Sequence, residues 1–317
     1  MKDLIVWFLT GGGAALLAAA LYVVYRGFRS SLRPLMIFQA GWSAAFRSLS
    51  GAPRAVVAIG LVIATGAGLQ LTSTAFPIFD EQTFFVTSIV WQAVMATALA
   101  ALAVFVHLFI IHDLFAERRF GAKTHFYRGP AVNQSLHPRP PPLSLLVRAG
   151  ALGFGIWLLT YGLHVATNAL AVFSPQLAPF ATPDLIRSTV YFGGTFASFL
   201  IVTLLSLVRP ALSLGSSRPV LLGIGTAVGR APVLYSLTVL LLIPPAIIGW
   251  LTVFIPHLFL PASVVARLVG AVILLVFSIF QLMAVEASTI FLMNRAMNQS
   301  ARSDEAQPAA AAAQSAQ

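Results

Sequence analysis

Residues 84–111 read FFVTSIVWQAVMATALAALAVFVHLFII and contain no Asp, Glu, Lys or Arg. A helix needs about 20 apolar residues to cross the hydrocarbon core of a bilayer, so this stretch predicts a transmembrane helix. The segment that follows it is basic, with Arg118, Arg119, Lys123, Arg128, Arg139 and Arg148. Because Lys and Arg stay on the cytoplasmic side of a membrane, this segment also predicts the orientation of the span.

Six more apolar runs of similar length cover residues 4–25, 55–75, 149–173, 189–208, 233–254 and 263–293. Together they predict an all-α integral membrane protein with seven transmembrane helices, its N-terminus outside and its C-terminus cytoplasmic. Sixteen of the 19 Lys and Arg residues follow runs one, three, five and seven, as this orientation requires. The first run is longer than the apolar core of a secretory signal peptide and its basic residues come after it, so we expect it to remain uncleaved.

Spans two to seven form three hairpins in this interpretation, behind one leading helix. Each hairpin begins after a proline, and its first span ends close to Phe76-Pro77, Phe173-Ser174-Pro175 or Phe254-Ile255-Pro256. The alternative is that proline punctuates three unrelated helices, since it is common at helix starts and just past helix ends. We expect one polytopic membrane domain over residues 1–302 and a disordered cytoplasmic tail over residues 303–317, which are rich in Ala, Gln and Ser.

Two short segments outside the spans are amphipathic. In residues 36–49 the apolar side chains Phe38, Trp42, Ala45, Phe46 and Leu49 share one face, and Gln39, Ser43 and Arg47 share the other. Residues 219–228 show a weaker version of the pattern. An aromatic anchor with a basic rim is typical of a helix lying on the cytoplasmic leaflet, so anionic lipids are the expected partners there.

A small cavity near the membrane midplane is the main candidate site. Gly66, His164 and Pro245 each lie eleven residues before the proline that ends their hairpin's first span, which places them at a similar depth. Pro244-Pro245 removes two backbone donors, and the carbonyls freed in this way need partners inside the protein. The predicted lining is Gly66, Trp157, Tyr161, His164, Asn168, Pro244 and Pro245. The alternative is a closed bundle, with a static kink and a histidine satisfied by one interhelical hydrogen bond.

His107 and Glu286 are a second candidate, a polar pair in the inner leaflet. Glu286 lies near the cytoplasmic end of its span, where it can also reach lipid headgroups. The chain has no cysteine, which excludes thiolate catalysis and Cys-ligated metal. It also shows no metal-ligand spacing, nucleophile elbow or paired carboxylates, so we expect no cofactor, no metal and no catalytic residue. Without a basic soluble domain, nucleic acid is not an expected partner.

The stretch from Trp42-Ser43-Ala44-Ala45-Phe46-Arg47 to Pro53, followed by a span, resembles the repeat unit of the glycerophosphodiester-phosphodiesterase membrane-domain family and related envelope proteins. Residues 287–295, ASTIFLMNR, close the last span in a similar way. The resemblance covers parts of the first and last hairpins. It implies several membrane helices preceded by amphipathic segments, and it implies no reaction.

The leading functional hypothesis is a non-enzymatic scaffold, assembly or envelope-homeostasis protein of a bacterial inner membrane. Small residues on the spans favour close packing with partner membrane proteins or with a second copy. The first alternative is a transporter or permease component with a small midplane site, favoured by the hairpins and the diproline. The second is a lipid-modifying membrane enzyme.

Overall fold

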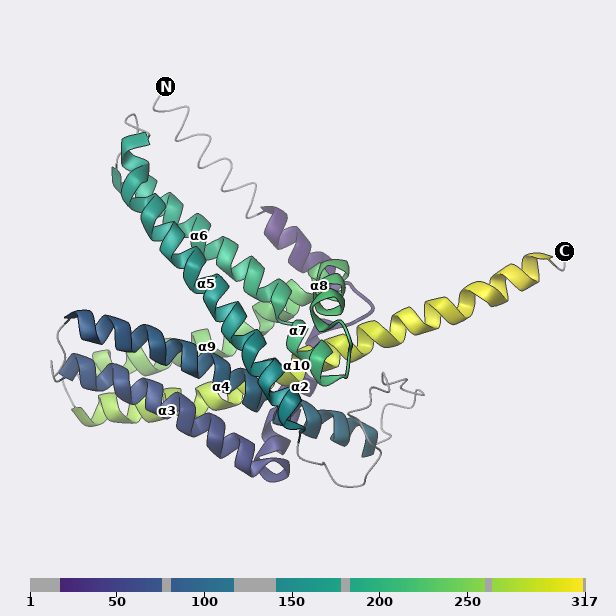
Figure 1. Ribbon diagram of the computed structural model, residues 1–317, viewed down its shortest axis with the longest axis horizontal. Coiled ribbons are helices and arrows are strands. Elements are labelled where there is room, and N and C mark those ends of the chain that lie inside the picture. The colour runs from purple at the N-terminus through teal and green to yellow at the C-terminus, as the bar shows by residue number, and fades with distance from the viewer. Residues whose placement is uncertain (1–17, 76–80, 117–140, 178–182, 260–263, 316–317) are drawn as a thin grey trace.

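The computed structural model describes residues 18–75, 81–116, 141–177, 183–259 and 264–315, and most of these are helical, with no strand among them (Figure 1). Helical residues 18–28 come first. The elements that follow are α2 (Pro34–Gly51), α3 (Pro53–Ala75), α4 (Glu81–Ala116), α5 (Leu143–Leu177), α6 (Pro183–Leu205), α7 (Val208–Ser213), α8 (Pro219–Gly229), α9 (Ala231–Phe259) and α10 (Val264–Ser315). Most of the predicted first span, residues 4–25, lies outside the described residues.

Five stretches are long and apolar enough to cross a membrane: Thr87–His112, Leu143–Phe173, Arg187–Ser213, Ala231–Thr252 and Val269–Met297. A sixth is obtained if α2 and the start of α3, which meet at 104°, are counted as one broken span. The prediction of an all-α chain with several helices long and apolar enough to cross a membrane is confirmed at this level. The count of seven spans and the orientation remain predictions.

Proline determines where several of these helices begin. The first residue of α2, α3, α6 and α8 is a proline, and Pro232 is the second residue of α9. Proline suits this position because its ring fixes a helical φ angle and the first-turn N–H it lacks has no intrahelical acceptor. Of the prolines predicted to precede the hairpins, Pro53 and Pro232 lie at helix starts, whereas α5 begins at Leu143, directly after Pro142.

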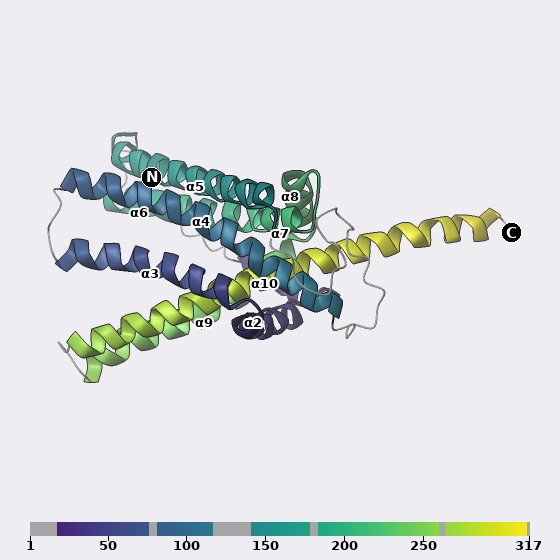
Figure 2. The same cartoon turned by 60° about the horizontal axis from the view of Figure 1, so that its bottom comes forward.

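The helices converge at one end of the bundle and diverge towards the other (Figures 1 and 2). Near the convergence α10 packs on α2, α3, α4, α7 and α9, and the sequence neighbours α3 and α4, α5 and α6, and α9 and α10 pack against each other. We call the convergent end the basic end because the following described residues lie in or next to its segments: Arg26, Arg29, Arg33, Arg47, Arg54, Arg148, Arg209, Arg218, Arg230 and Arg295. The opposite end is called the far end.

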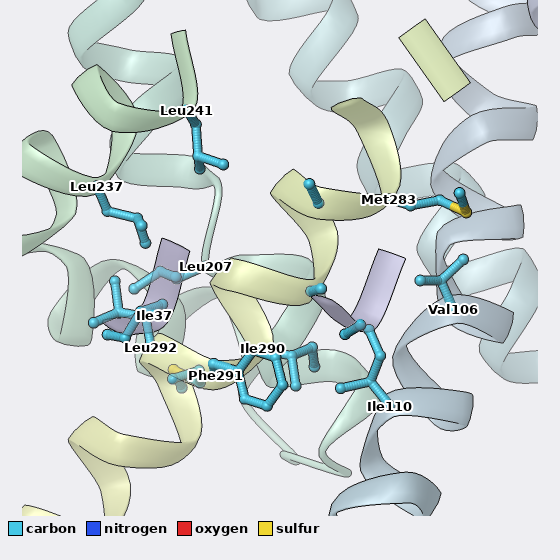
Figure 3. Close-up of a cluster of buried hydrophobic side chains, with 14 of the residues drawn as sticks. Ile37, Val106, Ile110, Leu207, Leu237, Leu241, Met283, Ile290, Phe291 and Leu292 are labelled. Carbon is cyan, nitrogen blue, oxygen red and sulfur yellow. The ribbon is translucent and has the colours of Figure 1, made fainter. Parts of the chain in front are cut away.

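The main hydrophobic core lies at the basic end. Ile37 of α2, Ile110 of α4, Leu207, Leu237 of α9 and Ile290 of α10 meet there and are almost fully buried (Figure 3). The core therefore joins elements from all three predicted hairpins, and it is the frame that holds the polar groups described below.

α2 differs in part from the predicted interfacial helix. It runs crosswise to α3, as a helix in the membrane plane would, but the face containing Gly41 is buried against Ser288 of α10. The predicted apolar face is only partly free: Trp42 and Phe46 contact Phe277 and Phe280 of α10, with Phe46 still 57% exposed. α2 is thus a structural layer of the core as well as a surface helix.

The C-terminal segment belongs largely to α10. α10 continues to Ser315, through most of the segment expected to be disordered, and it projects from the rest of the molecule (Figure 1). Alanine, which is abundant there, has the highest helix propensity of all residues.

Candidate functional site

Four polar side chains form a cluster inside the core at the basic end, which we call the ion cluster. His107 Nε2 lies 2.8 Å from Glu286 Oε2, and His107 Nδ1 lies 2.8 Å from Ser213 Oγ. Arg209 Nη2 lies 2.7 Å from the other carboxylate oxygen of Glu286. His107, Ser213 and Glu286 are at most 1% exposed, whereas the Arg209 side chain is 22% exposed.

The ion cluster takes its members from the first and third predicted hairpins and from the short helix that follows the second. His107 comes from α4, Glu286 from α10, and Arg209 and Ser213 from the short helix α7 that follows α6. Arg209 and Ser213 are four residues apart, so one face of α7 presents both to the core. The cluster therefore connects the hairpins where they converge.

Burial makes these contacts strong and their loss costly. A carboxylate taken out of water pays several kcal/mol of desolvation, which is offset only when its oxygens are paired. Each oxygen of Glu286 faces a cationic or hydrogen-bonding group from another helix, although the Arg209 guanidinium approaches as an ion pair without the N–H alignment of a hydrogen bond. Glu286 was also expected to reach lipid headgroups, but it is 1% exposed and enclosed by the core.

The order Ser213–His107–Glu286 is that of a nucleophile, a base and an orienting acid. Ser213 Oγ has no exposed surface in this conformation, so a substrate carbonyl cannot approach it. The described residues also hold no group of three His, Cys, Asp or Glu side chains suited to a metal ion. The geometry therefore favours a structural role for the ion cluster over a catalytic or metal-binding one.

A second polar region lies on the far half of α5, and we call it the α5 stripe: Trp157, Tyr161, His164 and Asn168. The rings of Trp157 and Tyr161 stack with centroids 5.3 Å apart, and Asn168 Nδ2 lies 3.2 Å from His164 Nε2. His164 is exposed, and the other three are half-buried. The stripe borders the face that α5 buries, where Gly153 meets α4 and Thr167 meets Gly194 of α6.

The diproline does not interrupt its helix, because α9 is helical from Ala231 to Phe259. Pro245 has no N–H to donate to the Leu241 carbonyl, and Gln281 Nε2 of α10 donates to that oxygen instead, at 2.6 Å. The freed carbonyl thus has the partner that an apolar environment demands. This arrangement corresponds to the static alternative considered for the diproline.

The structure does not bring Gly66, His164 and Pro245 into one cluster. Gly66 packs on Trp91 and Met95 of α4. Among the described residues, α3, α5 and α9, which carry the three, form no extended interface with one another. Equal spacing from a proline gives equal depth only for parallel helices, and here the helices diverge. The midplane cavity they were predicted to line remains a prediction.

Sequence reasoning paired His107 with Glu286 but missed Arg209, Ser213 and the role of Gln281. Arg209 was assigned to a cytoplasmic loop because it follows an apolar run. One feature of the sequence could have indicated Arg209. Glu286 lies inside an apolar stretch and needs a cationic partner, and the basic residues at the ends of the other spans were the candidates.

Comparison of the chain with protein-family models, curated proteins and solved structures finds no match. The likeness of residues 42–53 to the glycerophosphodiester-phosphodiesterase membrane-domain family is therefore not supported by a family match.

Proposed function

We propose that this chain is a scaffold or assembly protein of a bacterial inner membrane, which binds other membrane-embedded helices between or beside its hairpins. In this proposal the basic end faces the cytoplasm, in line with the distribution of Lys and Arg. The ion cluster and the core hold the hairpins together at that end, and the diverging far halves are the binding region.

The observation that carries the proposal is the exposed polar stripe on α5. Polar side chains within a membrane span normally face protein or a water-filled cavity, because lipid offers them no hydrogen-bond partner. His164 is exposed, and its partner among the described residues is Asn168 on its own helix. A helix from another protein placed against the stripe would bury both side chains and supply interhelical hydrogen bonds.

The neighbouring surfaces suit close helix contact. A Cβ atom added to Gly193 of α6, beside the Gly194 that packs on Thr167 of α5, would meet no atom within 4 Å. Glycine lets two helix backbones approach closely, so this position is compatible with a tightly packed partner. Beside Gly193, the Phe192 side chain is 73% exposed and adds an aromatic contact surface.

Site-directed photo-crosslinking in intact membranes tests this proposal. The photoreactive residue p-benzoylphenylalanine replaces Tyr161 in the stripe or, as the matched control, Leu159. Two residues turn a helix by about 200°, so Leu159 points to the opposite side of α5. We expect a discrete protein adduct from position 161 only, and it should be lost in His164→Leu/Asn168→Leu.

Two outcomes would contradict the scaffold proposal. Lipid adducts of equal yield from both positions would show that the stripe faces the bilayer. Labelling of Asn168→Cys by a hydrophilic thiol reagent, without a protein adduct at position 161, would indicate a water-filled path and favour the transport alternative. The chain lacks cysteine, so a single introduced thiol gives a clean signal.

A further inference from the structure

α8 exposes an apolar face that the rest of the described protein leaves uncovered. Val220 is 46% exposed, Leu221 70% and Val228 60%. The opposite face, with Gly223 and Ala227, is buried. A helix with one apolar face open and the other fixed to protein needs an apolar environment on its open side.

The position of α8 identifies that environment. In both views α8 runs crosswise to α5 and α6 at the basic end, as a helix lying in the plane of a membrane surface would (Figures 1 and 2). It packs firmly on α7: a Cβ atom at Gly223 would lie 2.7 Å from Cα of Val208. The helix is therefore held in place, and its open face has a fixed direction.

Charge defines the chemistry of the expected ligand. Arg218 precedes α8 and Arg230 follows it, and the sequence contains no Asp or Glu between Asp184 and Glu286. Of these two acids, Glu286 is buried in the ion cluster and paired with Arg209. A shallow, open depression of about 490 Å³ lies along the first two turns of α8 and is lined by Arg218, Pro219, Val220, Leu221, Ile224 and Gly225. A basic group beside an apolar depression matches a lipid with an anionic headgroup and acyl chains.

We propose that α8 is a binding site for anionic phospholipid in the leaflet at the basic end. Leu221, Ile224 and Val228 lie among the acyl chains, and Arg218 and Arg230 contact the phosphate groups at the two ends of the helix. Because α8 is seated on α7, bound lipid also supports the segment that supplies Arg209 and Ser213 to the ion cluster. This site is separate from the α5 stripe and does not depend on a protein partner.

Native mass spectrometry of the purified full-length protein tests the charge requirement. Phosphatidylglycerol or phosphatidylcholine is titrated into the detergent-solubilised protein, and lipid adducts are counted. A basic residue near a membrane surface contributes about fivefold to the affinity for anionic lipid. We therefore expect Arg218→Gln and Arg230→Gln each to weaken phosphatidylglycerol binding about fivefold and to leave phosphatidylcholine unchanged. Arg187→Gln, at the far end, is the matched control and should change neither.

Spin labels in nanodiscs test the depth of α8. Single cysteines replace Leu221, Val228 or, as a reference in the preceding loop, Ser217. Labels at 221 and 228 should be accessible to oxygen and shielded from a water-soluble relaxation agent, and the label at 217 should show the reverse. Equal water exposure of all three labels, or equal binding of the two lipids by the unaltered chain, would overturn the lipid site and leave the partner proposal for α5 intact.

Discussion

Two histidines of this chain occupy opposite kinds of environment. His107 is completely buried at the basic end and has hydrogen-bond partners on two other helices, Glu286 and Ser213. His164, in the far half of α5, is exposed and bonds to Asn168 one turn along its own helix. His107 thus belongs to a satisfied cluster that joins helices of one chain, whereas in our proposal the uncovered stripe around His164 binds a helix of another chain.

The largest effect is expected from breaking the ion cluster. Arg209→Met leaves the buried Glu286 carboxylate with His107 as its remaining charged or hydrogen-bonding partner, so the free energy of unfolding should fall by about 3 kcal/mol. Unfolding of the purified protein in bicelles measures this change. Arg218→Met, which removes an exposed charge, should change stability by less than about 0.5 kcal/mol.

A double variant sharpens this prediction. Adding Glu286→Leu to Arg209→Met replaces both charges by apolar groups, and a large part of the lost stability should return. If the single and double variants are equally unstable, the loss comes from packing of the Arg209 side chain and not from an unpaired carboxylate.

Glycine substitutions compare the packing of the two regions. A Cβ atom at Gly27 would clash with the Pro232 backbone at the basic end, whereas one at Gly162 in the far half of α5 would meet open space. Gly27→Ala should therefore destabilise the purified protein by about 1–3 kcal/mol. Gly162→Ala should be neutral or stabilising by about 0.5–1 kcal/mol, because alanine favours the helix. Equal effects at both positions would contradict the difference in packing.

A smaller effect is expected at the diproline. Pro245 has no N–H for the Leu241 carbonyl, so Gln281→Leu leaves that carbonyl without a hydrogen-bond donor. The substitution should lower the unfolding free energy by about 1 kcal/mol. Pro245→Ala restores a backbone N–H within reach of that carbonyl. Gln281→Leu should thus lower the unfolding free energy by less in the Pro245→Ala background. An equal loss of unfolding free energy in both backgrounds would show that the Gln281 hydrogen bond does not compensate the Leu241 carbonyl for the missing N–H.

The sequence predicted the helices well because bilayer thickness sets the length of an apolar run. The run at 149–173 became the larger part of α5, which begins six residues earlier, at Leu143, just after three prolines. Side-chain partners were harder to predict. His107 and Glu286 are 179 positions apart in the sequence. Arg209 directly follows an apolar run, so its position indicated a cytoplasmic loop and not a buried partner of Glu286.

The predicted cavity shows a second limit of the sequence. Counting residues back from a proline gave Gly66, His164 and Pro245 a common depth, but depth says nothing about lateral position. Lateral position follows from which helices pack together and from their divergence towards the far end. The packing at the basic end depends on contacts such as Gly41 on Ser288 and Gly223 on Val208, which no local pattern reveals.

The comparison of His107 with His164 is tested most directly by measuring two properties of His107→Leu and His164→Leu. One property is the unfolding free energy of the purified protein, and the other is the yield of the protein adduct at position 161 per folded molecule in membranes. We predict that His107→Leu lowers the first by about 3 kcal/mol and leaves the second unchanged. His164→Leu should change the first by less than about 0.5 kcal/mol and reduce the second. If both variants lower both quantities together, or if His164→Leu destabilises the purified protein as much as His107→Leu does, the two histidines do not have separate roles and the account is contradicted.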